Sequence, residues 1–267
     1  MKTVSKIYNF LVFAFLYAPI VVMIVYSFNS IKSRSVFSGF SLQWYQELFK
    51  DEVIMNSLYT SLILAVAAAL ISTVIGTMAA VGINASRGWR KRTFLAVNNI
   101  PMVNPEIVTA VSMMILFVFV ISRFNSMEMG FGTLLISHVT FCIPYVTLEV
   151  LPKIKGMDSN IYNAALDLGC PPAKAFIKVV IPQIKPGIIT GMIMAFTLSL
   201  DDFIISYFNS GSTVQTLSVT IYSMTKKPYS PKINALSTLL FVAILVLLLI
   251  NNIRQSRSDT KKKGAKK

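Results

Sequence analysis

The sequence predicts an all-α, polytopic membrane protein with six transmembrane helices in a single membrane domain. Of its 267 residues, 54% are hydrophobic and 13% are charged, and the mean hydropathy is +0.65. Soluble domains carry roughly 25% charged residues. Six apolar runs have about the twenty residues that cross a bilayer, and the basic residues between them are distributed unevenly. These three observations leave little room for a soluble domain.

The first apolar run follows Lys2 and Lys6. It is too long for the core of a signal peptide and has no small-residue cleavage site, so we expect an uncleaved first span after a short N-terminus, 1–6. A basic tail, 254–267, closes the chain. The predicted spans, which together make up a domain over 7–253, are 7–29, 57–83, 101–121, 132–151, 185–206 and 233–253.

The second span carries small residues at every fourth position: Ala68, Ser72, Gly76 and Ala80. A ridge of small side chains lets a neighbouring helix approach closely. The third span opens with two prolines, Pro101 and Pro105. The fourth contains a histidine and a glutamate, and the fifth ends near two adjacent aspartates.

The charge distribution predicts the topology. Two basic residues precede the first span, four follow the second, five lie between Lys153 and Lys185, and seven are in the tail. Because six spans place both termini on one side, 18 of the 25 basic residues then share that side. Positively charged loops stay in the cytoplasm. We therefore expect cytoplasmic termini and a cytoplasmic central loop in a multi-pass protein of the inner membrane.

The central loop, 160–182, combines helical apolar spacing with a break. Ile161, Ala164, Ala165 and Leu168 lie at helical spacing, and Gly169-Cys170-Pro171-Pro172 stops that helix because glycine supplies a turn and proline cannot continue a helix. A second short apolar face then ends at Pro182. Two short helices joined at a glycine are suited to docking on another protein. The alternative is an amphipathic connector lying on the lipid surface.

The same loop resembles the EAA loop of ABC-importer permeases. In that family Glu-Ala-Ala is followed by three residues, Gly, nine residues and Ile-x-Leu-Pro, and here Ala164-Ala165, Gly169 and Val179–Pro182 stand at those positions. Asn163 replaces the usual Glu, while Asp167 retains an acid one turn later. More narrowly, four other stretches resemble PotC-type permeases of spermidine/putrescine importers: Ser27-Phe28-Asn29, Trp44-Tyr45 with Leu48-Phe49, Pro105–Val108 and Ser199–Phe203.

The resemblance implies a MetI-like permease fold and a function in polyamine import across a prokaryotic inner membrane. It implies three protein partners: a dimer of ATPase subunits that holds ATP and Mg, a second homologous permease, and an extracytoplasmic substrate-binding protein. It also assigns the docking of the ATPase to six positions of the central loop: Asn163, Ala164, Ala165, Asp167, Gly169 and Pro182.

Four of the eleven acids lie in predicted spans: Glu106, Glu149, Asp201 and Asp202. A charge at the centre of a spanning helix costs roughly 2.5–3.5 kcal/mol, so such residues face a cavity or a partner. No lysine or arginine lies deep in a span to pair with them, which indicates a pathway for a cation. Adjacent helical residues point about 100° apart, so one aspartate can bind the cation while the other caps a helix or pairs with a neighbouring subunit.

Two of these acids have simpler alternatives. Glu149 is four residues from Lys153, and the two could form a surface ion pair. Glu106 follows Pro105, where an acid is favoured by the unpaired N–H groups of a helix start. The single histidine, His138, is expected to make packing hydrogen bonds rather than to relay protons.

Several functions are excluded by what the sequence lacks. It has no G-x-x-x-x-G-K-[ST] loop for ATP, no cluster of metal ligands and no Ser/His/Asp grouping, and its two cysteines are isolated. We therefore expect a transport subunit without a cofactor and not an enzyme, and no binding of nucleic acid. The remaining alternatives are a permease of the same type for a sugar, an iron complex or another cation, and a secondary carrier or channel.

Overall fold

The computed structural model describes residues 2–33, 35–124, 128–243 and 245–246. The described residues form helices and no strand beyond an isolated bridge between Asn29 and Phe40, which confirms the all-α class. The chain divides into two compact units. One unit combines Met1–Asn56 with Thr220–Lys267, and the other is Ser57–Val219. They are described separately below.

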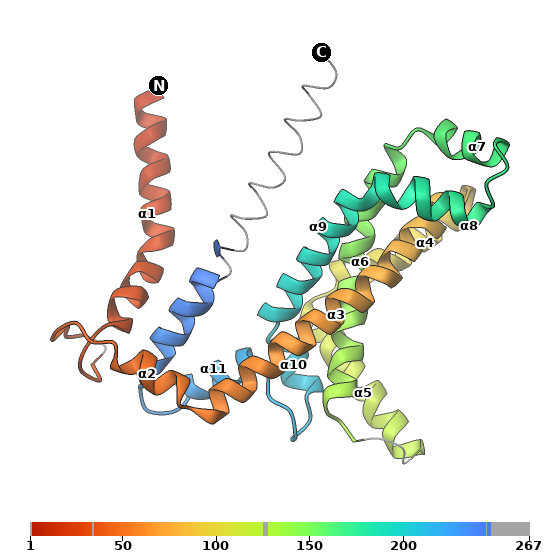
Figure 1. The fold of residues 1–267 in the computed structure, drawn as a ribbon. Coiled ribbons are helices and arrows are strands. Elements are labelled where there is room, and N and C mark those ends of the chain that lie inside the picture. The colour runs from red at the N-terminus through yellow and green to blue at the C-terminus, as the bar shows by residue number, and fades with distance from the viewer. Residues whose placement is uncertain (1, 34, 125–127, 244, 247–267) are drawn as a thin grey trace. The chain divides into compact units, whose positions relative to one another are not determined.

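Most of the spanning helices belong to the Ser57–Val219 unit (Figure 1). Its elements, in chain order, are α3 (Glu52–Ala85, which begins in the other unit), α4 (Gly88–Val103), α5 (Glu106–Phe124), α6 (Phe131–Lys155), α7 (Ser159–Asp167), α8 (Pro172–Ala175), the π-helical turn η1 (Phe176–Val180), α9 (Ile181–Asp201), α10 (Ile204–Asn209) and the first residues of α11 (Leu217–Thr225). Helix α6 lies alongside α9, and α7 and α8 lie beyond the ends of both (Figure 1).

Helix α6 packs between two ridges of small residues. The predicted ridge on α3 is buried, and a Cβ atom added to Gly76 would lie 2.8 Å from the side chain of Val146 on α6. Helix α9 has a second ridge with the same four-residue period: Gly187, Gly191, Ala195 and Ser199, all buried. A Cβ atom on Gly191 would lie 3.2 Å from the same valine. Val146, which is fully buried, thus fixes the distance of α6 from both neighbours.

Two helix boundaries differ from the predicted ones. The third span was expected to begin at Pro101, but Pro101 lies inside α4, and the chain is extended at Asn104 because the following proline disfavours helical backbone there. The spanning helix α5 therefore begins at Glu106. The fifth span was expected to reach 206, but α9 ends at Asp201 and the backbone of Asp202 is extended.

The other unit contains α1 (Lys2–Ser27), α2 (Gln43–Phe49) and the helix Lys232–Ala243. Asn29 organises the loop between α1 and α2: its side chain donates to the carbonyl of Val36 at 2.8 Å and accepts from the N–H of Ser38 at 2.9 Å. Trp44 on α2 is buried and donates to the carbonyl of Asn29. Lys232 forms ion pairs with Glu47 and Asp51, which holds the start of the last helix against α2.

In the described part of the chain, five helices are long and apolar enough to cross a membrane: Lys6–Ser27, Glu52–Ala85, Glu106–Phe124, Phe131–Lys155 and Pro172–Asp201. The sixth predicted span, 233–253, coincides at its start with the apolar helix Lys232–Ala243. Residues 247–253 of that span and the tail 254–267 lie outside the described residues.

The contact of α3 with α6 yields a prediction with a control on the same helix. Gly76→Ala should lower the melting temperature of the purified protein by several degrees, because overpacking a tight contact costs about 1–3 kcal/mol. Gly82→Ala should leave it unchanged or raise it slightly, since nothing lies within 4 Å of a Cβ atom there and alanine favours helix. Adding Val146→Ala should partly restore the Gly76→Ala protein. Equal melting temperatures for the two single variants would contradict this packing.

Candidate functional site

Three of the four predicted pathway acids lie together in the Ser57–Val219 unit. Glu106 is the first residue of α5, Asp201 is the last residue of α9, and Asp202 follows it. The side chain of Glu106 interacts directly with that of Asp202 and lies within electrostatic range of Asp201. Residues almost a hundred positions apart therefore form one acidic cluster at the end of α9.

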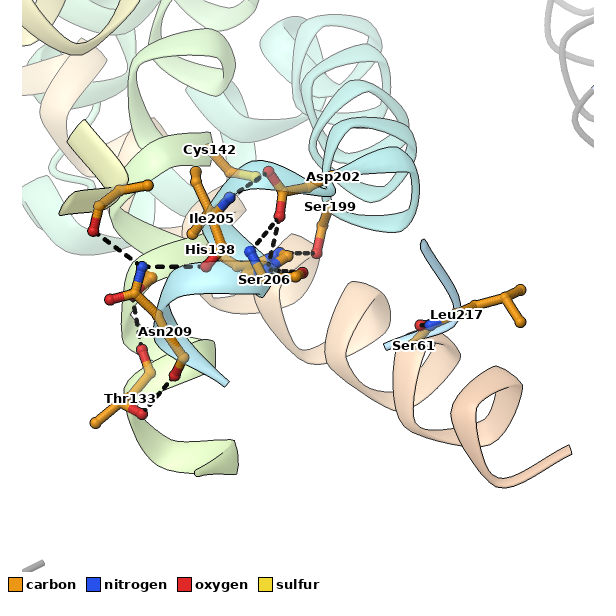
Figure 2. Close-up of polar contacts among 12 residues, drawn as sticks. Ser61, Thr133, His138, Cys142, Ser199, Asp202, Ile205, Ser206, Asn209 and Leu217 are labelled. Atoms are coloured by element: carbon orange, nitrogen blue, oxygen red, sulfur yellow. Dashed lines mark hydrogen bonds and ion pairs between the residues drawn. The ribbon is translucent and has the colours of Figure 1, made fainter. Parts of the chain in front are cut away.

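The two aspartates have different environments. The side chain of Asp202 is buried, and its carboxylate accepts hydrogen bonds from the backbone N–H groups of Ile205 at 3.2 Å and Ser206 at 2.8 Å (Figure 2). These groups belong to the first turn of α10, whose N–H groups have no partner within the helix. Asp202 thus caps α10. The expectation that one of the two aspartates caps a helix is met by Asp202.

His138 on α6 lies at the break between α9, which ends at Asp201, and α10, which begins at Ile204. Its side chain is fully buried. The Nδ1 atom lies 2.8 Å from the hydroxyl of Ser199 on α9, and the Nε2 atom lies 3.1 Å from the hydroxyl of Ser206 and 3.4 Å from Oδ2 of Asp202 (Figure 2). The histidine therefore makes packing hydrogen bonds to both sides of the break, as the sequence led us to expect.

Asp201 and Glu106 are the accessible members of the cluster. Asp201 is exposed and Glu106 is half-buried. Among the described residues, the ion pairs made by lysine or arginine are those of Lys232 in the other unit. The negative charge of the cluster is therefore not neutralised by a lysine or arginine of the described chain, which suits a site that a cation visits.

Aromatic rings accompany the acids. Tyr145 on α6 lies within electrostatic range of Glu106 and packs against Phe141 with ring centroids 5.3 Å apart. Phe203, next to Asp202, packs against Tyr207 at 5.5 Å. The faces of such rings attract ammonium groups.

Glu149 lies apart from this cluster. It is eleven residues beyond His138 on α6, which is about 16 Å along a helix, and its Cβ atom lies close to Gly191 of α9. The structure shows no ion pair between Glu149 and Lys153 in the part of the chain that it describes.

Sequence reasoning missed a second polar group that holds α10 in place. The hydroxyl of Thr133 on α6 donates to the carbonyl of Asn209 at 2.9 Å, and the amide of Asn209 donates to the carbonyls of Ala110 on α5 at 3.2 Å and Ile205 at 3.1 Å (Figure 2). These residues join α5, α6 and α10. Their signal in the sequence is a polar side chain within an apolar stretch, but their partners are 76 and 99 positions away.

The predicted docking loop forms the end of the unit opposite the acidic cluster along α6 and α9. Asp158 caps α7 by accepting from the N–H of Asn160 at 2.9 Å, and Gly169 ends it with a φ of 79°, a conformation that favours glycine. Ile161 and Leu168 are exposed at 46% and 88%. Of the positions assigned to docking, Asn163, Ala164, Asp167, Gly169 and Pro182 are exposed and Ala165 is half-buried.

Pro182 does not end a short helix, contrary to the prediction. Residues from Pro172 to Asp201 form one continuous helical segment. Proline cannot donate the hydrogen bond of a regular turn and its ring clashes with the carbonyl four residues earlier. The helix accommodates Pro182 through the wider turn η1, in which the N–H of Ile181 donates to the carbonyl of Phe176, five residues back. The docking loop is thereby joined directly to α9.

The chain is similar in sequence to known membrane proteins. A family model described as "Binding-protein-dependent transport system inner membrane component" matches residues 72–259. The chain is 34% identical over 246 residues to the spermidine/putrescine transport system permease protein PotC of Haemophilus influenzae, covering 92% of this chain and 94% of that protein. It is 36% identical over 249 residues to the putrescine transport system permease protein PotI of Escherichia coli, covering 92% and 89%.

Solved structures share the fold. A chain of a bacterial ABC transporter involved in the import of the acidic polysaccharide alginate superposes with a TM-score of 0.71 at 13% identity, covering 93% of this chain and 94% of that chain. A chain of the MetNI methionine ABC transporter gives 0.59 at 19% identity, covering 76% and 96%. At these identities the likeness concerns the fold alone, and it confirms the MetI-like architecture.

The two aspartates should differ in their effect on stability. Asp202→Ala should lower the melting temperature of the purified protein markedly, because leaving buried hydrogen-bonding groups without a partner costs about 1–3 kcal/mol. Asp201→Ala should change the free energy of unfolding by less than about 0.5 kcal/mol, as exposed substitutions usually do. Thermal unfolding followed by intrinsic fluorescence measures both, and a larger loss for Asp201→Ala would show that the cap is misassigned.

Proposed function

The chain belongs to the family of binding-protein-dependent transport system inner membrane components, and we propose that it is the transmembrane permease subunit of an ATP-driven importer of polyamines. The PotC and PotI relatives are named for spermidine and putrescine, so the proposed substrates are linear polyamines. The single observation that carries this proposal within the chain is the acidic cluster of Glu106, Asp201 and Asp202 without a neutralising lysine or arginine among the described residues.

The proposed cation pathway contains Asp201, Glu106 and Glu149. Asp201 and Glu106 offer accessible carboxylates, and the aromatic rings beside them favour ammonium groups. Glu149 stands further along α6, towards the docking loop, and is suited to a later position on the path. Asp202 lies in the same cluster, and its oxygens cap α10. A chain of acids at different depths passes a cation without binding it too tightly to release it.

The proposed assembly contains this permease, a second homologous permease, a pair of ATPase subunits and an extracytoplasmic binding protein. It lies in the inner membrane of a prokaryote, with both termini and the docking loop in the cytoplasm. This orientation is supported by the 18 basic residues on the terminal side. Hydrolysis of ATP with Mg takes place in the ATPase subunits, and this chain is a transport subunit.

The docking loop is proposed to transmit the motion of the ATPase pair. Ile161 and Ala165 of α7 and Leu168 at its C-terminal end lie at helical spacing on one face. Ile161 and Leu168 are exposed and Ala165 is half-buried, so this face can bury apolar area against an ATPase. The loop continues through η1 into α9, and α6 enters it from the other side. Movement of the loop therefore moves α6 and α9 together and alternates access to the acidic cluster.

The substrate is tested by uptake into proteoliposomes that contain the assembled importer and ATP. Labelled spermidine or putrescine should accumulate only with ATP and the binding protein present. Glu106→Gln and Asp201→Asn should each lower the initial rate at least tenfold while the ATPase still co-purifies. Glu128→Gln, an exposed acid outside the cluster, is the control and should transport normally. Normal uptake by both cluster variants would refute the acidic pathway.

The docking face is tested by co-purification. Leu168→Asp should weaken binding of the ATPase by more than tenfold, because burying a leucine side chain contributes about 1.5–3 kcal/mol. The side chain is 88% exposed, so the fold should be unaffected. Asn160→Asp adds the same charge at an exposed position outside this face and outside the six docking positions, and this variant should bind normally. If both variants retain the ATPase equally, α7 is not the docking helix.

A further inference from the structure

We infer that His138 is a positioning residue for the cation site: through Asp202, it fixes the break between α9 and α10 at which Asp201 and Glu106 present their carboxylates. This inference rests on the proposed function of the acidic cluster. His138 itself is fully buried and does not reach the exposed side of the site, so it acts on the cation through other groups.

The break needs such a support because it lies in an apolar part of the chain. Helix α9 ends at Asp201, and α10 begins three residues later. Its free N–H groups and the buried carboxylate would each be costly without a partner. Asp202 satisfies the N–H groups of Ile205 and Ser206, and the carboxylate in turn needs a donor on its remaining side. The hydroxyl of Ser206 is one such contact, and His138, from a different helix, places its Nε2 atom 3.1 Å from that hydroxyl and 3.4 Å from Oδ2 of the carboxylate.

Both ring nitrogens of His138 have partners. A carboxylate oxygen only accepts hydrogen bonds, so we place a hydrogen on the Nε2 atom, which lies 3.4 Å from Oδ2 of Asp202 and nearer still to the hydroxyl of Ser206. The Nδ1 atom and the hydroxyl of Ser199 share a hydrogen bond of 2.8 Å. Ser206 contacts both Nε2 of the histidine, at 3.1 Å, and the carboxylate of Asp202. His138 therefore links the last turn of α9, the break and the first turn of α10 (Figure 2).

The two aspartates therefore have different roles: Asp202 holds the break, and Asp201 is available to the cation. The oxygens of Asp202 face two backbone N–H groups and the side chains of Ser206, His138 and Glu106, whereas the neighbouring Asp201 is exposed. Because the backbone at Asp202 is held in an extended conformation, the direction of Asp201 is fixed as well. Loss of the histidine contact would release the break and move Asp201 relative to Glu106.

Two substitutions of His138 test the contacts of its two ring nitrogens separately. The amide of glutamine reaches the position of Nε2, so His138→Gln keeps a donor towards Asp202. The amide of asparagine reaches only the position of Nδ1, so His138→Asn keeps the contact with Ser199 and loses the one with Asp202. In the reconstituted importer we expect uptake by His138→Gln within about twofold of the unchanged protein, and a loss of about tenfold for His138→Asn, with the ATPase co-purifying normally in both. Equal impairment of the two variants, or normal uptake by His138→Asn, would overturn the inference.

Combination with Asp201→Asn distinguishes positioning from a general loss of structure. If His138 acts through the acidic site, His138→Asn should reduce uptake little further in a protein that already carries Asp201→Asn. Two independent losses would multiply, and that result would overturn the inference. If Asp201→Asn alone transports normally while His138→Asn does not, the acidic pathway itself fails and the histidine is structural.

Serine variants decide the matter if His138→Asn does not assemble. Ser206→Ala removes the hydroxyl that contacts both His138 and Asp202, whereas Ser199→Ala removes only the contact with Nδ1. The inference predicts reduced uptake for Ser206→Ala and normal uptake for Ser199→Ala. The reverse order would overturn it.

Discussion

The contact of Val146 with two glycines sets the geometry on which both sites of the Ser57–Val219 unit depend. Gly76 on α3 and Gly191 on α9 bring their helices onto the same fully buried valine of α6. Lipid does not drive helices together as water does, so close packing of small residues has to supply much of their association. In such a contact the helices cannot slide without overlap of atoms, and α6 with its neighbours forms a stiff group.

This stiff group of helices connects the acidic cluster at one end of the unit with the docking loop at the other. Helix α6 carries His138 to the acidic cluster and then leads into the docking loop, and α9 returns from that loop to end at Asp201. The chain is helical without interruption from Pro172 to Asp201, because the wider turn η1 accommodates Pro182. A rigid pair of helices that shares both of its ends with functional regions provides a physical route for coupling over the thickness of a membrane. At the acidic end, the hydrogen bonds of His138, Asp202 and Ser206 hold the break between α9 and α10 in place.

The sequence predicts the parts of this structure that depend on local rules. Apolar length reveals the spans, and a four-residue period reveals the small ridge on α3, whose close packing is confirmed. The same period is present on α9 at Gly187, Gly191 and Ala195 and could have been found in the same way. The glycine turn after α7 also follows from local preference, because the φ of Gly169 is positive.

The remaining features depend on partners distant in the sequence. The usual effect of proline predicts that a helix ends at Pro182. This prediction fails because, in the wider turn η1 before the proline, the N–H of Ile181 donates to the carbonyl five residues earlier and the helix continues. The different environments of Asp201 and Asp202 cannot be read from two identical adjacent letters. Asp202 is buried against the N–H groups of Ile205 and Ser206 and lies next to His138 on another helix, more than sixty positions away. For the same reason, helical spacing did not indicate that Glu149 would lie apart from the other acids.

The central claim is that the docking loop and α6 move as one body when the importer works. Spin labels placed at Ile161 of α7 and Ile136 of α6, both exposed, with Cys170 replaced by serine, measure their separation directly by pulsed electron resonance. The account predicts that the distance between the labels stays constant within about 2 Å between the nucleotide-free and the ATP-trapped importer. A change of more than about 5 Å, one helical turn, would show that the loop moves independently of α6 and would contradict it.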